Sequence, residues 1–289
     1  MATVEIDAKG VCYIDGIEYP AVGFGTYPFK GRQCAEAVAA AADAGYRIID
    51  TATFYDNFEP IGQEVNRAGR LEFYIISKVW RDKQAPKSLV EDLNATLERL
   101  QTTYLDAYLL HWPNSQIPIE ETLQTLEEFR QKGKIRHIGL SNVNSNHVKR
   151  ALEVGVPITW VQVEMHPQFC DFDLLKFCDS QGIAVQAWAP LGRGRLGSDA
   201  FLAKLGKKYN KSAAQVALRW IIQHGCMPLP ASKNKKHIQE NLDIMDFILS
   251  AEDMKQIDER AKQGQRERYP SLDEYDFTYA ECWPHLNTP

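Results

Sequence analysis

Short apolar runs alternate along the chain with longer stretches in which apolar side chains recur at helical spacing. The strand-like runs lie at residues 46–50, 73–79, 105–111, 135–141, 158–164, 183–188 and 226–229. Helical spacing is clearest at residues 88–100, 119–131, 145–153 and 212–223. One more short strand is predicted within residues 20–26, and an alanine-rich helix at 34–44 that Gly45 ends. The pattern predicts eight strand-helix units.

Repeated alternation of strands and helices requires a parallel sheet, and eight units in about 250 residues are typical of a closed (β/α)8 TIM barrel. Residues 1–289 contain no linker rich in Pro, Gly or Ser, so we expect a single α/β domain. Alternation within residues 3–18 predicts an N-terminal β-hairpin that could close one end of the barrel. The aromatic, non-periodic C-terminal tail after Gly264 is expected to lie either over the barrel mouth or beside it.

Composition excludes several functional classes. The chain is 44% hydrophobic and 25% charged, with a net charge of −5, so no general attraction to nucleic acid or to anionic membranes is expected. It lacks a secretory signal and any apolar run near the roughly 20 residues of a membrane span, which predicts a cytoplasmic protein. The six cysteines lack metal-binding spacing, and neither Cys170, Cys178 nor His166 suggests a metal site.

Polar side chains occupy the C-terminal ends of the predicted strands, where barrels of this kind carry their active sites. Asp50, Lys78 and His111 end three strands, and Tyr55 follows Asp50 by five residues. Because an ammonium inside an apolar strand is costly unless a carboxylate pairs with it, we expect Asp50 to contact Lys78. A nearby cation stabilises the anion of a phenol, so Lys78 would make Tyr55 a better proton donor. His111 would orient a carbonyl oxygen.

Each of these residues also has an ordinary interpretation. Asp50 could cap a helix, Tyr55 could be a core residue and His111 could be a satisfied strand-end histidine. A lysine in an apolar strand is harder to explain in this way. The presence of all four at neighbouring strand ends therefore favours catalysis.

The chain resembles the aldo-keto reductases over nearly its whole length. The matching stretches are GFGT at 23–26, GYRIIDT at 45–51, Tyr55, SKVW at 77–80, HWP at 111–113, GLSN at 139–142, QVEMHP at 162–167, PLGRG at 190–194 and EN at 240–241. AWAP at 187–190 is most similar to the prokaryotic group that contains 2,5-diketo-D-gluconate reductases and methylglyoxal reductases. The resemblance implies a monomeric enzyme that reduces small aldehydes or ketones to alcohols with a nicotinamide cofactor.

In that resemblance, Asp50, Tyr55, Lys78 and His111 match the catalytic residues, with Tyr55 as the proton donor. The residues expected to bind the cofactor are Gly25, Thr26, Asp50, Ser141, Asn142, Gln162, Trp188, Ala189, Leu191, Gly192, Arg193, Gly194, Ser232, Lys233, Asn234, His237, Glu240 and Asn241. Trp188 would stack on the nicotinamide ring. The substrate pocket would be formed by Tyr27, Phe54, Trp80, His111 and Trp112, and an aromatic pocket suits uncharged or modestly polar carbonyl compounds.

Residues 192–197 match the GxGxxG pattern of dinucleotide-binding Rossmann domains. The match comes late in the chain and lacks an acidic residue about 20 positions further on, so we reject that fold. Two interpretations remain: a loop that clasps the cofactor's diphosphate, and a solvated surface loop. The family resemblance favours the clasp.

One stretch departs from the family pattern. Where the family usually carries a lysine and an arginine that bind the 2′-phosphate of the cofactor, this chain has Ala231 and His237. Histidine does not reproduce the permanent, bidentate contact of a guanidinium with phosphate. Lys233, Lys235 or Lys236 could compensate. We therefore favour NADP(H) and keep NAD(H) as possible.

Two other functional classes are compatible with a barrel of this kind. A cofactor-sensing regulatory or binding protein of the reductase fold would also keep the catalytic residues, but the chain has no long N-terminal extension. A metal-dependent barrel hydrolase or isomerase would need clusters of carboxylate and histidine ligands at the strand ends, and the sequence shows none.

Overall fold

The computed structural model describes residues 3–114 and 116–264, so the predicted C-terminal tail lies outside the described residues. The eight predicted barrel strands form one parallel sheet in the order β11-β10-β9-β8-β7-β6-β5-β4. They are β4 (Phe24–Gly25), β5 (Ile48–Asp50), β6 (Tyr74–Val79), β7 (Leu105–Leu110), β8 (Ile135–Ser141), β9 (Trp160–Glu164), β10 (Ala184–Trp188) and β11 (Cys226–Pro228). Every strand-like run of the sequence contributes one strand, and the predicted (β/α)8 fold is confirmed.

Two main-chain hydrogen bonds join the first barrel strand to the last. Gly23 N donates to Pro228 O and Gly25 N donates to Pro230 O, each at 3.0 Å. A Cβ on Gly25 would lie 2.9 Å from the carbonyl oxygen of Leu229. Glycine at this position therefore permits the close approach of the two strands that closes the barrel.

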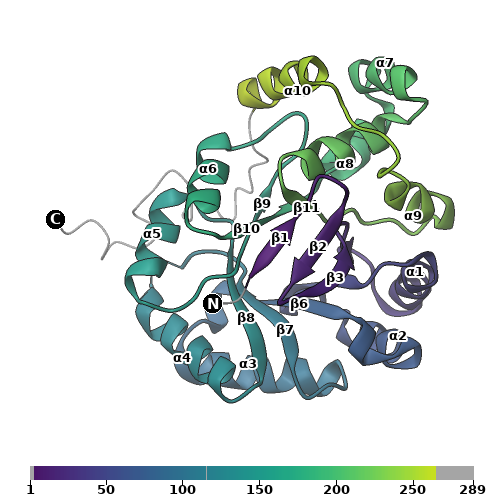
Figure 1. Cartoon of the computed structure of the whole chain (residues 1–289). Coiled ribbons are helices and arrows are strands. Elements are labelled where there is room, and N and C mark those ends of the chain that lie inside the picture. The colour runs from purple at the N-terminus through teal and green to yellow at the C-terminus, as the bar shows by residue number, and fades with distance from the viewer. Residues whose placement is uncertain (1–2, 115, 265–289) are drawn as a thin grey trace.

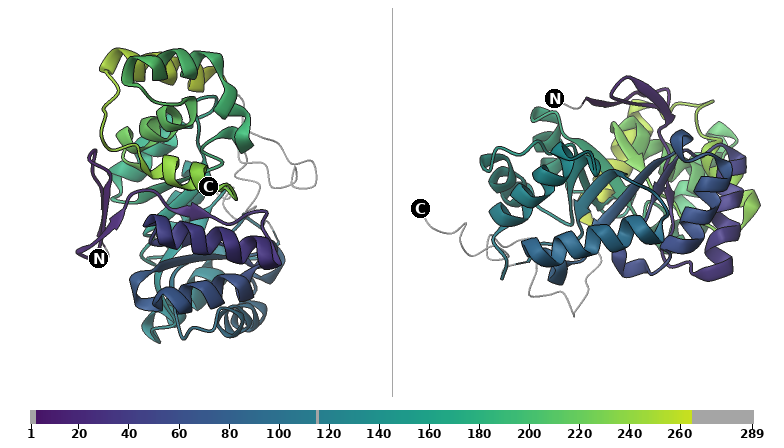
Figure 2. Two further views of the ribbon diagram at one scale, coloured as in Figure 1. Left: turned by 90° about the vertical axis from the view of Figure 1, so that its right-hand side faces the viewer. Right: turned by 90° about the horizontal axis from the view of Figure 1, so that it is seen from below.

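Helices surround the sheet, as Figure 1 and the two views of Figure 2 show. They are α1 (Gly31–Ala44), α2 (Phe58–Ala68), α3 (Pro86–Arg99), α4 (Ile119–Gln131), α5 (Ser145–Glu153), α6 (Phe172–Ser180), α7 (Ala200–Tyr209), α8 (Ala213–Gln223), α9 (Lys235–Leu242) and α10 (Ala251–Gln263). Gly45 follows α1 in the left-handed conformation (φ 107°), as its position in the sequence predicts. None of the described helices is long and apolar enough to span a membrane.

The predicted N-terminal hairpin is present, and a third strand extends it. β1 (Val4–Ile6), β2 (Val11–Ile14) and β3 (Ile17–Pro20) form an antiparallel sheet in that order. The prediction that the first barrel strand begins near Pro20 is corrected, because Pro20 belongs to this small sheet and β4 begins at Phe24.

The small sheet is attached to the end of the barrel where the strands begin. Asp15, in the turn after β2, contacts Nε2 of His137 at 2.9 Å, and Nδ1 of His137 contacts the hydroxyl of Tyr74 at 2.7 Å. Trp160 Nε1 donates to the same hydroxyl at 2.8 Å. Tyr74 and Trp160 are the first residues of β6 and β9. The opposite end, where the strands finish, is therefore left for the site.

Gly139 in β8 provides a test of barrel packing. A Cβ at this position would lie 2.7 Å from Leu109 Cγ and 2.7 Å from Trp160 O, in the strands on either side. We expect Gly139→Ala to lower the free energy of unfolding by about 1–3 kcal/mol, because both neighbours must shift. Urea denaturation measures the change. Gly197→Ala is the control, since its Cβ would meet no heavy atom within 4 Å; equal losses in the two variants would contradict the packing argument.

Candidate active site

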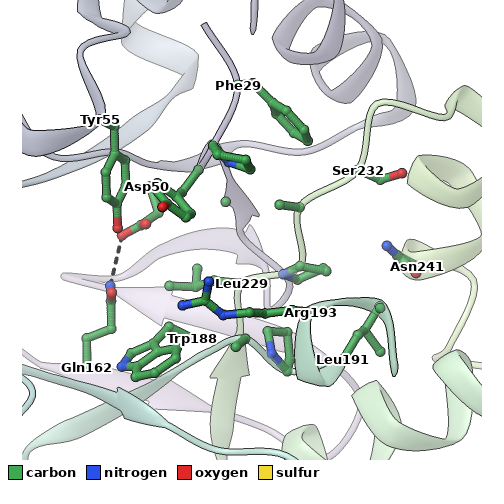
Figure 3. A pocket seen from close by; sticks show the side chains of 18 of the residues that line it. Phe29, Asp50, Tyr55, Gln162, Trp188, Leu191, Arg193, Leu229, Ser232 and Asn241 are labelled. Atoms are coloured by element: carbon green, nitrogen blue, oxygen red, sulfur yellow. Dashed lines mark hydrogen bonds between the residues drawn. The ribbon is translucent and has the colours of Figure 1, made fainter. Parts of the chain in front are cut away.

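A pocket of about 1130 Å³ opens at the C-terminal ends of the barrel strands. Figure 3 shows side chains from several strands and loops around it. The predicted site residues that line it are Gly25, Tyr27, Asp50, Phe54, Tyr55, Trp80, His111, Trp112, Ser141, Asn142, Gln162, Trp188, Ala189, Leu191, Arg193, Gly194, Ser232, His237, Glu240 and Asn241. Residues more than 200 positions apart in the sequence thus meet at one cavity.

Lys78 lies beneath the floor of this pocket, with its side chain fully buried. Its Nζ contacts the carboxylate of Asp50 at 2.8 Å and donates to the carbonyl oxygen of Thr51 at 2.8 Å. A third contact, at 3.4 Å, reaches the hydroxyl of Tyr55. The three N–H groups of the ammonium thus have three acceptors, one of which is the phenol at the pocket wall.

The electrostatics of Lys78 come from two opposing effects. Burial lowers the pKa of Lys78 below its ordinary 10.5, and the carboxylate of Asp50 opposes that fall. The carboxylate thus supports a positive charge in a place where water does not reach. A cation in contact with a phenol stabilises its deprotonated form relative to the neutral one.

Asp50 is held from a second direction by Gln162. The Nε2 of Gln162 donates to Asp50 Oδ1 at 2.8 Å, the dashed contact in Figure 3, and lies 2.9 Å from Gln186 Oε1. All three side chains are buried. The orientation of the Asp50 carboxylate is therefore set by partners on both sides.

His111 completes the catalytic set of the sequence prediction. Its ring makes edge contacts with the rings of Tyr55 and Trp80, at centroid distances of 5.6 Å and 5.1 Å. Burial, together with the charge of Lys78, holds the pKa of His111 well below 6.5. The imidazole is therefore neutral at neutral pH and carries one N–H that can donate a hydrogen bond.

Asn142 connects the ends of three strands. Its Nδ2 donates to the carbonyl oxygen of His111 at 2.8 Å and contacts Ser141 Oγ at 3.2 Å. Its Oδ1 accepts from Nε1 of Trp188 at 2.9 Å. Asn142 adopts a left-handed conformation (φ 58°), which asparagine tolerates better than most residues. The amide thus fixes the Trp188 indole next to the Ser141 hydroxyl.

Aromatic side chains form the wall around Tyr55. Phe54 stacks on Trp80 with centroids 4.3 Å apart and planes inclined by 18°, and Tyr27 lies 5.0 Å from the Tyr55 ring. Phe54 and Tyr27 remain 55% and 44% exposed. These large apolar surfaces face an open cavity, which is the usual character of a small-molecule site.

Comparison with known proteins identifies the family. The sequence model of the Aldo/keto reductase family matches residues 21–262. The chain belongs to the aldo-keto reductase family. The glyoxal reductase of Bacillus subtilis (strain 168) is 42% identical over 248 residues, which cover 84% of this chain and 90% of that protein.

Solved structures of aldo-keto reductases are also similar to the chain. One assigned as 2,5-diketo-D-gluconic acid reductase B has a TM-score of 0.85 and 31% identity, covering 93% of this chain and 95% of the other. The Bombyx mori aldo-keto reductase in complex with NADP has a TM-score of 0.82 and 33% identity, covering 90% and 95%. The first of these likenesses agrees with the subgroup that the AWAP stretch predicts.

The pocket of this aldo-keto reductase suits a long, polar cofactor. One end carries the hydroxyl and amide groups of Ser141 and Gln162 beside an indole face. The guanidinium of Arg193, from η4 (Gly192–Ser198), lies 6.0 Å from the Tyr27 ring centroid, so this loop reaches the loop after β4. Hydrogen-bonding side chains, Ser232 and Asn241 among them, line the wall near α9. These groups fit a ligand with an aromatic amide at one end, a negatively charged middle and a polar group at the other end.

Some predicted cofactor residues do not line the cavity: Thr26, Gly192, Lys233 and Asn234. The Thr26 hydroxyl donates to the carbonyl oxygen of Asp50 at 2.9 Å, and the Asn234 side chain caps α9. Their roles toward a cofactor stay predictions.

Sequence reasoning missed several wall residues, including Arg81, Ser198, Ser212 and Ala214. Ser212 and Gln215 form a capping box at the start of α8. That pattern is readable from the sequence as a helix start, although it does not reveal that the helix begins beside the pocket.

Removal of the buried ammonium tests the Lys78–Asp50 pair. We expect Lys78→Met to lower the free energy of unfolding by about 3–5 kcal/mol, because the buried Asp50 carboxylate loses its counter-charge. Adding Asp50→Asn should recover part of this loss. Lys132→Met is the control: Lys132 pairs with Glu128 at 3.1 Å on an exposed helix face, and we expect a loss below about 1 kcal/mol. Similar losses for the two lysines in urea denaturation would contradict the special role of burial.

Proposed function

We propose that this protein reduces aldehydes or ketones to alcohols with a nicotinamide cofactor, and that Tyr55 is the proton donor. The observation that carries the proposal is the contact of Lys78 Nζ with both Asp50 and the Tyr55 hydroxyl at the edge of the pocket. The reductase relatives support the same reaction class.

When bound, the reduced nicotinamide supplies a hydride to the carbonyl carbon. The residues of this chain manage the proton and the developing charge. As negative charge grows on the carbonyl oxygen, Tyr55 transfers its hydroxyl proton to that oxygen and neutral His111 donates a hydrogen bond. Lys78 stabilises the phenolate that remains, and Asp50 holds Lys78 in place. The product is the alcohol, and Tyr55 regains a proton from solvent.

The binding residues take their roles from the pocket and the family resemblance. Ser141, Asn142 and Gln162 would hold the carboxamide, with Trp188 against the nicotinamide ring. Arg193 and Gly194 would lie along the diphosphate. The adenosine end would be held by Ser232, His237, Glu240 and Asn241, all of which line the cavity.

The substrate is proposed to be a small, uncharged or modestly polar carbonyl compound. The aromatic wall of Phe54, Trp80 and Trp112 supports this choice. The 42% identity to the glyoxal reductase of B. subtilis adds support for a compact dicarbonyl. Assays of a panel of small aldehydes, dicarbonyls and keto-sugars with both cofactors would define the range of substrates.

A cytoplasmic location and a monomeric state stay predictions. Size-exclusion chromatography would test the monomeric state.

Removal of one hydroxyl tests the proton donor. We expect Tyr55→Phe to lower kcat by about 100- to 10,000-fold, the usual contribution of a general acid. Cofactor affinity, measured by quenching of protein fluorescence, should stay within about twofold because the ring remains. Tyr13→Phe, in β2 of the N-terminal sheet, should leave kcat unchanged. Wild-type turnover by the Tyr55 variant would refute the assignment.

Cofactor preference is proposed to be NADPH over NADH. Ala231 and His237, at the two positions where the family resemblance implies cations, both line the pocket. Lys236 is paired with Glu240 at 3.6 Å on an exposed helix face. We expect a modest preference in kcat/KM, which the double variant Ala231→Lys/His237→Arg should increase about tenfold or more, because a guanidinium binds phosphate with two hydrogen bonds. A strong preference of the natural protein for NADH would overturn the proposal.

A further inference from the structure

Tyr55 lies on a short turn with little regular hydrogen bonding of its own. The turn is η1 (Thr53–Tyr55), a single 3-10 turn followed by Asp56 in a left-handed conformation (φ 53°). Its middle residue, Phe54, is 55% exposed. The phenol must nevertheless keep its 3.4 Å contact with Lys78 Nζ. Contacts between the turn and the rest of the barrel must therefore fix it.

The hydroxyl of Thr53 makes the first of these attachments. Thr53 Oγ1 lies 2.8 Å from Asp92 Oδ2 and 3.1 Å from the main-chain oxygen of Lys78. Thr53 has a single hydroxyl hydrogen, which these two acceptors share, so the hydroxyl joins the turn both to Asp92 and to the backbone of the lysine whose ammonium contacts the phenol. Asp92, in α3, also accepts a hydrogen bond from the hydroxyl of Tyr108 in β7.

Burial of the Asp92 carboxylate costs free energy. It is 9% exposed, and in the described part of the chain its hydrogen-bond donors are two hydroxyl groups rather than a cation. Burial raises the pKa of its carboxyl group, which the two hydroxyls only partly oppose. An apolar residue would pack between a helix and a strand at lower cost. The gain from Asp92 must lie in what it holds, which is the Thr53 hydroxyl together with the Tyr108 hydroxyl.

A second attachment lies on the other side of the turn. Asn57 is fully buried; it accepts from Thr51 Oγ1 at 2.6 Å and donates to Thr26 Oγ1 at 3.0 Å and to Phe29 O at 3.1 Å. This attachment ties the turn to the loop after β4. The Thr53 attachment is the one that reaches Lys78.

We propose that Thr53 and Asp92 are positioning residues for the reduction, which hold the turn so that the Tyr55 phenol stays in contact with the Lys78 ammonium. The inference rests on the proposed role of Tyr55. In the described part of the chain, the ionisable side chains in contact with the phenol include Lys78, His111 and Tyr27, with Asp50 behind Lys78. Lys78 makes the closest of these contacts, so the acidity of Tyr55 depends most on that distance.

The main variant is Thr53→Val, which removes the hydroxyl and keeps the shape of the side chain. Retreat of the phenol by about 1 Å weakens its interaction with the ammonium and raises its pKa by about one unit. A proton donor is active in its protonated form, so the alkaline limb of the kcat profile should move to higher pH by about one unit. At neutral pH kcat should fall by up to about tenfold, because a weaker acid transfers its proton more slowly, and cofactor affinity should not change.

Four further variants separate positioning from loss of packing. Asp92→Ala removes the acceptor of the Thr53 hydrogen bond, whereas Asn would keep an acceptor oxygen. Asp92→Ala should therefore change kcat and the alkaline limb in the same direction as Thr53→Val, and the double variant should lose little more than either single one, because both changes break the same link. Thr53→Ser keeps a hydroxyl at this position, so the alkaline limb of its kcat profile should lie at the same pH as in the natural protein. Thr125→Val is the matched control, since among residues 3–114 and 116–264 that buried hydroxyl bonds only to the main-chain oxygen of Glu121 in α4. The pH profile of this variant should equal that of the natural protein.

The pKa of Tyr55 can also be measured without any turnover. The tyrosinate absorbance of Thr53→Val, minus that of the same variant carrying Tyr55→Phe, gives the titration of Tyr55 directly. A raised pKa there supports the proposal even if no carbonyl compound is reduced, in which case the proposed function fails separately. A folded Thr53→Val protein with an unchanged Tyr55 titration, or a fall in kcat without movement of the alkaline limb, would overturn the proposal.

Discussion

The burial of one ammonium beneath the pocket constrains most of the site. Lys78 has no access to water, so the surrounding strands must supply its charge partner and its hydrogen-bond acceptors. Asp50 can do so only because β5 and β6 are parallel neighbours, paired through Asp50 and Ile76. Gln162, from β9 across the barrel, then orients the carboxylate. Barrel geometry and proton chemistry therefore depend on the same contacts.

The two ends of the barrel have different roles. Where the strands begin, His137 and Tyr74 link the N-terminal sheet to the core through Asp15. Where they finish, Asn142 links the ends of β7, β8 and β10 around the cavity. Polar networks at both ends are satisfied largely by side chains from distant parts of the sequence. This separation leaves the loops of the pocket free to differ among members of the family while the other end keeps the barrel together.

The barrel could be predicted from the sequence because each buried strand is a nearly continuous apolar run. Helices α4 and α5 begin and end at the predicted residues. The third strand of the N-terminal sheet was missed, since Asp15 and Gly16 interrupt the alternation with a turn that brings 17–20 back alongside β2. Lys78 could be singled out because its charge contradicts its surroundings.

The supports of the site could not be predicted in the same way. Thr53 and Asp92 are separated by 39 positions, and neither residue is unusual in its own segment. Asn142 was expected to contact a cofactor, whereas the structure also shows it holding Trp188 and the His111 main chain. Such links depend on how helices and loops dock on the sheet, which single-sequence patterns do not contain.

The junction of β4 with β11 joins barrel architecture to ligand binding. Two glycine N–H groups hold it, and proline at 228 and 230 prevents the opposite strand from donating at those positions. Gly25 and Ser232, on either side of this junction, both line the cavity. A ligand that contacts both residues bridges the junction of β4 with β11. Ligand binding should therefore stabilise this junction against local unfolding, and the stabilisation should increase with ligand concentration.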